Sequence, residues 1–218
     1  MVKKNFLRNL SGEGLKEALQ GYSSDYINIQ PLTEKELFDR YENYTDPLLS
    51  YVRTMNADIV FVLGNEARAM FGHLADYRLN PQKRKNLLDA YGHFRRLNLD
   101  AFKIICDELD KFLFSYFQKH YHYDYRNVRR NFLLEYSKKY FAAQKAYLDA
   151  QVKEQTGSDR LVGNIIEEYF QAAKLYVDLF IFLQENNSGL EKTKWKAVAK
   201  STFVVVGSAL GILLSFLA

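Results

Sequence analysis

Apolar residues recur along most of this chain with the spacing of an α-helix, and no stretch keeps the alternation of a β-strand. The clearest repeat follows residue 81, with spacings of three, four or seven between Leu87, Tyr91, Phe94, Ala101, Ile105, Leu109, Phe112 and Tyr116. This seam predicts one long helix that packs on neighbours and ends in the polar run 120–126. We therefore expect an all-α fold, a bundle of long antiparallel helices with short loops.

Turn and cap residues divide this pattern into separate helices. Thr33 and Glu36 have the spacing of a capping box, so a helix is expected to begin there. Thr45-Asp46-Pro47 is expected to interrupt it, with Asp46 as the N-cap of a second helix that runs to about Tyr77. The remaining predicted features are a turn at Asn80-Pro81, helices at 126–154 and 158–185, and a last turn at 186–189.

The C-terminal part of the sequence has the pattern of a membrane span. Residues 201–218 include no charged side chain, and as a helix they would be about 27 Å long against a hydrocarbon layer of about 30 Å. Residues 197–199 extend the run, since Lys200 can reach the membrane surface, and Trp195 lies at an interfacial position. Lysines 192, 194, 196 and 200 precede it, which predicts that the N-terminal side is cytoplasmic.

These boundaries define the expected organisation of the chain. Residues 1–31 form an N-terminal arm with a short helix at most, and residues 32–190 form the helical bundle. A basic juxtamembrane segment at 191–200 leads to a transmembrane helix at 201–218. Within that helix Gly207 and Gly211 form a small-xxx-small pair, which allows two spanning helices to pack closely.

Composition fits this picture without pointing to a particular activity. The net charge of +4 is too small to indicate nucleic acid by itself. Cys106 is the single cysteine and lies in an apolar stretch, which predicts a buried, inert thiol in a reducing compartment. Residues 1–8 are basic but no apolar region follows them, so no secretory signal is expected. Phosphate-binding glycine loops, nucleophile elbows and HExxH pairs are absent from the sequence.

One motif carries candidate chemistry. The stretch from Arg68 to His73 has the form Arg-x4-His and resembles the motif of the HEPN superfamily of all-helical domains, a resemblance that covers residues 46–155 in architecture and two residues in motif. In the nuclease members of that family, the Arg and His face a groove shared by two protomers and cleave RNA without a metal. The resemblance implies that His73 moves the proton of an attacking 2′-hydroxyl while Arg68 holds the phosphate.

The predicted hairpin at Asn80-Pro81 places further polar residues near this motif. In an antiparallel pair turning there, Arg68 is expected to face His93, His73 to face Leu88, and Glu66 to face Arg95. Glu66, His93 and Arg95 are therefore candidate supporting residues. The alternative is that this polar cluster only fixes the register of the two helices.

A second polar stretch lies at residues 120–130. His120, His122 and Asp124 are possible metal ligands, but no further ligand is identifiable, and no metal or cofactor is expected. Tyr121, Tyr123 and Tyr125 are interleaved with Arg126, Arg129 and Arg130, a combination that binds single-stranded nucleic acid in other proteins. The interpretation that we favour is a loop packed beside a solvated helix face.

A divergent Arg-x4-His motif in a small helical protein with one predicted span is similar to the membrane accessory proteins of type VI-B CRISPR loci. That resemblance implies a membrane effector in prokaryotic antiviral defence, at the bacterial inner membrane, beside an RNA-guided nuclease. The expected partners are lipid, further copies of the chain assembled into a ring or pore, and RNA or the nuclease. The alternatives are a membrane-tethered, metal-independent ribonuclease toxin and an anchored scaffold protein.

Overall fold

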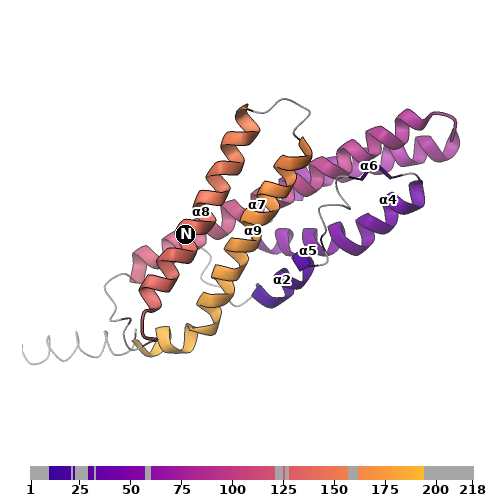
Figure 1. Cartoon of the computed structure of the whole chain (residues 1–218). Helices are drawn as coiled ribbons and strands as arrows, with labels where there is room; N and C mark the ends of the chain where they lie inside the picture. The colour runs from indigo at the N-terminus through magenta and orange to yellow at the C-terminus, as the bar shows by residue number, and fades with distance from the viewer. Residues whose placement is uncertain are drawn as a thin grey trace, which may run out of the picture.

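The structure, a computed structural model, is built from helices (Figure 1). They are α2 (Gly12–Gln20), α4 (Glu34–Arg40), the π-helical turn η1 (Tyr41–Thr45), α5 (Asp46–Met55), α6 (Val60–Leu79), α7 (Arg84–His120), α8 (Phe132–Thr156) and α9 (Val162–Glu185). Residues 187–193 are also helical. The residues described are 10–20, 22, 29–31, 33–56, 60–120, 125, 128–156 and 162–193. These residues include no strand, and the all-α prediction is confirmed.

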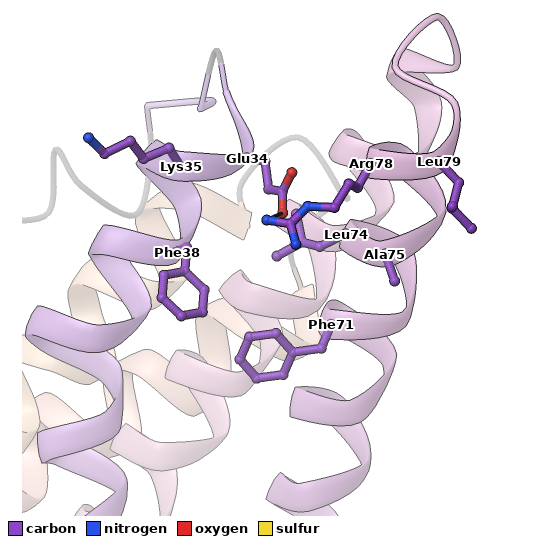
Figure 2. Close-up of a pocket in the computed structure, with 8 residues that line it drawn as sticks. All are labelled: Glu34, Lys35, Phe38, Phe71, Leu74, Ala75, Arg78 and Leu79. Carbon is purple, nitrogen blue, oxygen red and sulfur yellow. Dashed lines mark ion pairs between the residues drawn. The ribbon is translucent and has the colours of Figure 1, made fainter.

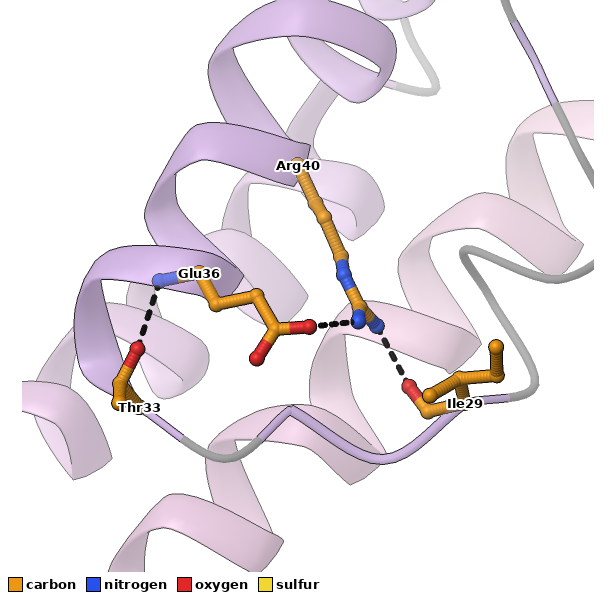
Figure 3. A network of polar contacts seen from close by, with 4 residues as sticks. All are labelled: Ile29, Thr33, Glu36 and Arg40. Carbon is orange, nitrogen blue, oxygen red and sulfur yellow. Dashed lines mark hydrogen bonds and ion pairs between the residues drawn. The ribbon is translucent and has the colours of Figure 1, made fainter.

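The predicted helix start at Thr33 is confirmed. The Thr33 hydroxyl accepts a hydrogen bond of 3.1 Å from the backbone N–H of Glu36, as expected of an N-cap (Figure 3). The Glu36 carboxylate pairs with Arg40, one turn later. Arg40 also donates to the carbonyl of Ile29, so this buried guanidinium ties the segment before α4 to the helix.

The predicted interruption at Thr45-Asp46-Pro47 is wrong, because the chain passes from α4 through η1 into α5 without leaving helical conformation. Pro47 lies in the first turn of α5. A proline has no backbone N–H to donate and its ring crowds the carbonyl four residues before it, and a wider π-helical turn relieves this crowding. Thr45 is buried and donates from its hydroxyl to Asn98 of α7 at 2.9 Å.

The second predicted helix, from residue 47 to about Tyr77, is divided in two in the structure. α5 ends at Met55, and the next residue, its C-cap Asn56, has an extended backbone with φ −149° and ψ 103°. The Asn56 side chain donates to the carboxylate of Glu108 on α7 at 3.1 Å. The contact between Asn56 and α7 thus accompanies a helix break for which the neighbouring sequence has no signal.

α6 and α7 form the antiparallel hairpin predicted from Asn80-Pro81, with the turn closed by a bond from the Lys83 N–H to the Asn80 carbonyl. α7 is 37 residues long and ends at the predicted polar run. Its predicted seam is confirmed: the residues at 87, 91, 94, 101, 105 and 109 are buried, and those at 112 and 116 are partly buried against the core.

α8 lies antiparallel to both α7 and α9. The Tyr136 hydroxyl near the start of α8 donates to the Leu113 carbonyl near the end of α7 at 2.9 Å. The ring of Phe132 at the start of α8 stacks on that of Phe182 near the end of α9, with centroids 5.4 Å apart. The two predicted helices in this region therefore exist and pack as neighbours.

The apolar interior is divided into two clusters. The larger one runs between α7, α8 and α9 and includes the buried leucines of α2 and α5. The start of α2 approaches α9 so closely that a Cβ on Gly12 would lie 2.4 Å from the side-chain oxygen of Gln184, which explains the glycine. The smaller cluster lies in the hairpin that extends beyond this bundle in Figure 1 and consists of Leu37, Met70, Leu74, Leu87, Ala90, Tyr91 and Phe94.

Candidate functional site

A polar cluster lies between α6 and α7, close to the position predicted from the hairpin. The Nδ1 of His93 is 2.7 Å from a carboxylate oxygen of Glu66, and a carboxylate makes this ring nitrogen the donor. Arg96 approaches the same carboxylate at 3.9 Å. Both partners of the His93–Glu66 contact are 22% exposed, so this pair is partly shielded from water.

His73 joins this cluster through its ring. The rings of His73 and His93 stack with centroids 5.3 Å apart and planes inclined by 16°. The Nδ1 of His73 is buried and has no hydrogen-bond partner within the described part of the chain. A histidine that acts as a general base is usually oriented by a bond to its second nitrogen, and here His93 has such a bond, to Glu66, and His73 does not.

Arg68 is on a different side of the same helix. α6 is a regular α-helix through this region, and five residues of such a helix correspond to a rotation of about 140° about its axis. Arg68 is exposed, and among the described residues no hydrogen bond, ion pair or ring contact joins it to His73, His93 or Glu66. One copy of the protein therefore does not bring the two residues of the motif together.

None of the three predicted facing pairs is found as a side-chain contact within the described part of the chain. Arg68 was expected opposite His93, but the contacts of His93 are with Glu66 and His73. His73 was expected opposite Leu88 but stacks on His93, and Glu66 was expected opposite Arg95 but contacts His93 and Arg96. Arg95 instead lies over the ring of Tyr91 at 5.8 Å. A register counted only from the turn fixes which segments meet, but side-chain length and helix rotation decide which residues touch.

A second polar network, not predicted from the sequence, lies between α7, α8 and α9. Asp110 of α7 accepts hydrogen bonds from Tyr140 of α8 at 3.0 Å and from Tyr176 of α9 at 2.8 Å. One turn away along α7, Asp107 accepts from Tyr147 of α8. The seven-residue spacing from Tyr140 to Tyr147 and from Tyr169 to Tyr176 is a signal that could have indicated one face on each helix.

Electrostatics keep these tyrosines neutral. Burial raises the pKa of Tyr140 and of Tyr176 well above the usual tyrosine value, and the charge of Asp110 and the hydrogen bond to it raise both further. Burial with the bond to Asp107 does the same for the pKa of Tyr147. A phenol held protonated by a carboxylate acceptor is a poor nucleophile and a poor base. The network is therefore suited to holding three helices in register.

An ion pair between Glu154 and Lys103 also lies between these three helices. Glu154 of α8 accepts from the Tyr169 hydroxyl at 2.7 Å and pairs with Lys103 of α7. Burial opposes the ionisation of Glu154, but the hydrogen bonds from Lys103 and Tyr169 outweigh it and lower the pKa of its carboxyl. This site links the three helices through one charged group.

Cys106 is buried, as the sequence predicted. Its thiol lies 3.9 Å from the backbone carbonyl of Tyr169. Burial and the nearby carboxylates of Asp107 and Asp110 raise the pKa of the thiol well above its usual value. A thiol in this setting stays protonated and is not a reactive nucleophile.

A groove of about 770 Å³ lies between α4 and α6 (Figure 2). Phe38 of α4 and Phe71 of α6 point into it, with ring centroids 6.3 Å apart. Glu34 and Arg78 form an ion pair of 3.1 Å at one end, and Lys35 also lines the wall. Its eight lining residues, all within the described part, offer an apolar surface and no pair of groups for proton transfer.

Several predicted features lie outside the described residues: Tyr121, His122, Tyr123, Asp124, Arg126, Gly207, Gly211 and the span 201–218. Within the described ranges, no three histidine, cysteine, aspartate or glutamate side chains are grouped so that they could hold a metal ion. None of the helices in those ranges is long and apolar enough to cross a membrane.

Comparisons with models of protein families, with curated proteins and with solved structures give no match. The fold and the site thus define the class, an all-helical protein with a histidine–glutamate cluster in a helical hairpin. The resemblance to HEPN domains remains a prediction from two residues.

Proposed function

We propose that the protein is a membrane-anchored helical effector that acts by assembling with further copies of itself at a membrane. The observation that carries this proposal is the run of residues 201–218, which has no charge and follows four lysines within residues 192–200. The resemblance to accessory proteins of type VI-B CRISPR loci adds the setting, antiviral defence beside an RNA-guided nuclease at the bacterial inner membrane.

Within one copy, the geometry of the Arg-x4-His motif argues against RNA cleavage. His73 is engaged with His93 and has a buried, unbonded Nδ1, while Arg68 is exposed elsewhere on α6. Acid–base cleavage needs a histidine and a phosphate-binding arginine within reach of one phosphodiester. The cluster is better suited to fixing how α6 packs on α7.

Attachment of the protein to a membrane would favour the assembly of several copies. Confinement to a membrane raises the effective concentration of copies, so weak contacts between them become populated. Gly207 and Gly211 offer a face at which two spanning helices could approach closely. A ring or pore of several copies is the form of activity that this arrangement supports.

A membrane-tethered, metal-independent ribonuclease is the second candidate, and one observation favours it. The contact of His93 with Glu66 gives one oriented histidine beside His73, and an arginine from a second copy could complete such a site. An anchored scaffold that recruits a partner is a third candidate, for which no contact in the structure argues.

The test compares two double variants in cells challenged with phage or in a growth-arrest assay. Substituting Gly207→Leu with Gly211→Leu is expected to abolish activity, whereas Arg68→Ala with His73→Ala is expected to retain it. The reverse result, with the Arg–His variant folded and oligomeric and cellular RNA cleaved only by the unchanged protein, would establish the ribonuclease and overturn the proposal.

A further inference from the structure

The outer face of α8 carries an apolar stripe that none of the described helices covers. Its members are Leu134, Phe141, Leu148 and Val152, which are 54%, 64%, 51% and 58% exposed. They are opposite the buried face of the same helix, which includes Phe132, Tyr136, Ala143, Tyr147 and Ala150. Four large apolar side chains exposed on one helix face are unusual for a surface that meets only water.

Lysines are part of the same stripe. Lys138 and Lys145 are exposed and alternate with the apolar residues, so that spacings of four and three residues continue from 134 through 138, 141, 145 and 148 to 152. Positions with this spacing lie on one side of an α-helix. The α8 stripe, defined as these six residues, is therefore both apolar and basic.

We propose that the α8 stripe lies on the surface of an anionic lipid bilayer and forms a membrane contact separate from residues 201–218. Amphipathic helices that lie in the membrane interface bury large apolar side chains among the acyl chains, and their lysines extend to anionic headgroups. This inference deepens the membrane function proposed above and rests on it for the presence of the protein at a membrane.

The position of α8 in the fold supports a lipid bilayer as the surface that the stripe contacts. The start of α8 lies beside the end of α9, where Arg129 is 5.9 Å from the ring centroid of Phe182 and a Cβ on Gly189 would lie 3.1 Å from the side chain of Val128. The described chain ends at residue 193 and the uncharged run begins at 201, so the span would leave the bundle close to the start of the stripe. Figure 1 shows the start of α8 and the end of α9 side by side at one end of the molecule.

Charge distinguishes lipid from a second copy of the chain. Two α8 stripes packed against each other would bring Lys138 and Lys145 of both copies into one apolar interface, and like charges there oppose association. Asp149 is an exposed acid that flanks the stripe, and one such carboxylate per copy cannot neutralise two lysines per copy. Anionic headgroups supply the missing negative charge at the depth that lysine side chains reach.

The test uses the full chain with a nitroxide label at Phe141→Cys or Leu148→Cys. The control label is at Asp178→Cys, an exposed position of α9 beside α2. Cys106 is buried, so the label reacts with the introduced thiol. Accessibility of the label to oxygen, which enters lipid, and to a water-soluble nickel chelate is measured in phosphatidylcholine vesicles with and without phosphatidylglycerol.

We expect the oxygen-to-nickel accessibility ratio at both stripe positions to be several-fold higher than at the control position in phosphatidylglycerol vesicles. It should fall in phosphatidylcholine alone and in the variant with Lys138→Glu and Lys145→Glu. A ratio equal to that of the control would overturn the proposal, since the stripe would then face water. Low accessibility to both reagents, with spin–spin broadening, would also overturn it, because the stripe would then be covered by a second copy.

Vesicle flotation tests the predicted anchor at residues 201–218 separately from the α8 contact. Protein that floats with both kinds of vesicle while its stripe labels remain water-like contradicts only the α8 contact. Protein whose stripe labels enter phosphatidylglycerol vesicles, but which floats equally well after deletion of residues 197–218, supports the stripe and contradicts the anchor.

Discussion

Single side chains with both polar and apolar character hold the three long helices together. Tyr140 and Tyr176 bring their rings into the core and their hydroxyls to one carboxylate, that of Asp110. A buried hydroxyl is costly to leave without a hydrogen bond. The Tyr140 and Tyr176 hydroxyls therefore favour the one register of α8 and α9 along α7 in which both reach Asp110. We interpret this network as the device that selects the register of the bundle.

Glu154 gives a pH-dependent prediction. Its folded-state pKa is lowered from 4.5, so its contribution to stability is present above that value and is lost as the pH falls through the lowered pKa. Glu154→Gln should reduce the free energy of unfolding at pH 7 by about 1 kcal/mol, since the partly exposed pair is screened by water. The difference from the unchanged protein should shrink between pH 5 and 3, as measured by chemical denaturation.

The matched control is Glu185→Gln, at an exposed position of α9. It should leave the free energy of unfolding unchanged at both ends of this pH range. A penalty for Glu154→Gln that stayed constant down to pH 3 would mean that Lys103 and Tyr169 do not stabilise the ionised carboxylate.

At the level of helices, the hairpin of α6 and α7 has an apolar cluster of its own. Met70, Leu74 and Phe94 pack there with Leu37 of α4, apart from the larger core of α7, α8 and α9. Both helices of the hairpin also reach the larger cluster, α7 through its later part and α6 through Leu63 near its start. Elements with few shared contacts can open separately, so the hairpin should be able to unfold locally.

Met70→Ala tests this division. Met70 is 0% exposed, and its truncation should cost about 2–4 kcal/mol through lost burial and a cavity. Amide hydrogen exchange should become faster in α4, α6 and the first half of α7 and remain unchanged in α8 and α9. Met70→Leu, which preserves volume, is the control. Uniform acceleration in all helices would show one cooperative unit.

Local sequence signals predicted most helix boundaries. Thr33 begins a helix and Asn80-Pro81 is followed by a turn because capping oxygens and proline act through neighbouring backbone groups. The break at Asn56 was not predicted, because no local signal in the sequence marks it, and the contact that accompanies it is with Glu108, fifty-two residues away along the chain. Pro47 was read as a break, but widening of a single turn accommodates it within a continuous helix.

The candidate site was only partly predictable. The turn placed Glu66 and His93 in facing segments, and the structure brings them into contact. The stacking of His73 on His93 depends on how α6 is rotated about its axis, which the spacing of residues does not determine. The tyrosine network was missed because its carboxylate acceptors lie on a different helix from the repeating tyrosines.

For the molecule as a whole, the described helices form an elongated body with the hairpin at one end and the close of α9 at the other (Figure 1). Attachment through residues 201–218 would place the end of α9 nearest the membrane and leave the hairpin cluster of His73 and His93 farther along the body. The proposed membrane function therefore depends first on whether residues 201–218 hold the protein in a membrane.

Fractionation of cells that produce the full chain or a variant lacking residues 197–218 tests this claim most directly. The full chain should sediment with membranes, resist an alkaline carbonate wash and be released by detergent, because an uncharged helix of this length is stable in the bilayer. The deletion variant should be in the supernatant with its helical circular dichroism retained, and the Gly207→Leu, Gly211→Leu variant should stay in the membrane. A full chain that remains in the supernatant without detergent would contradict the account.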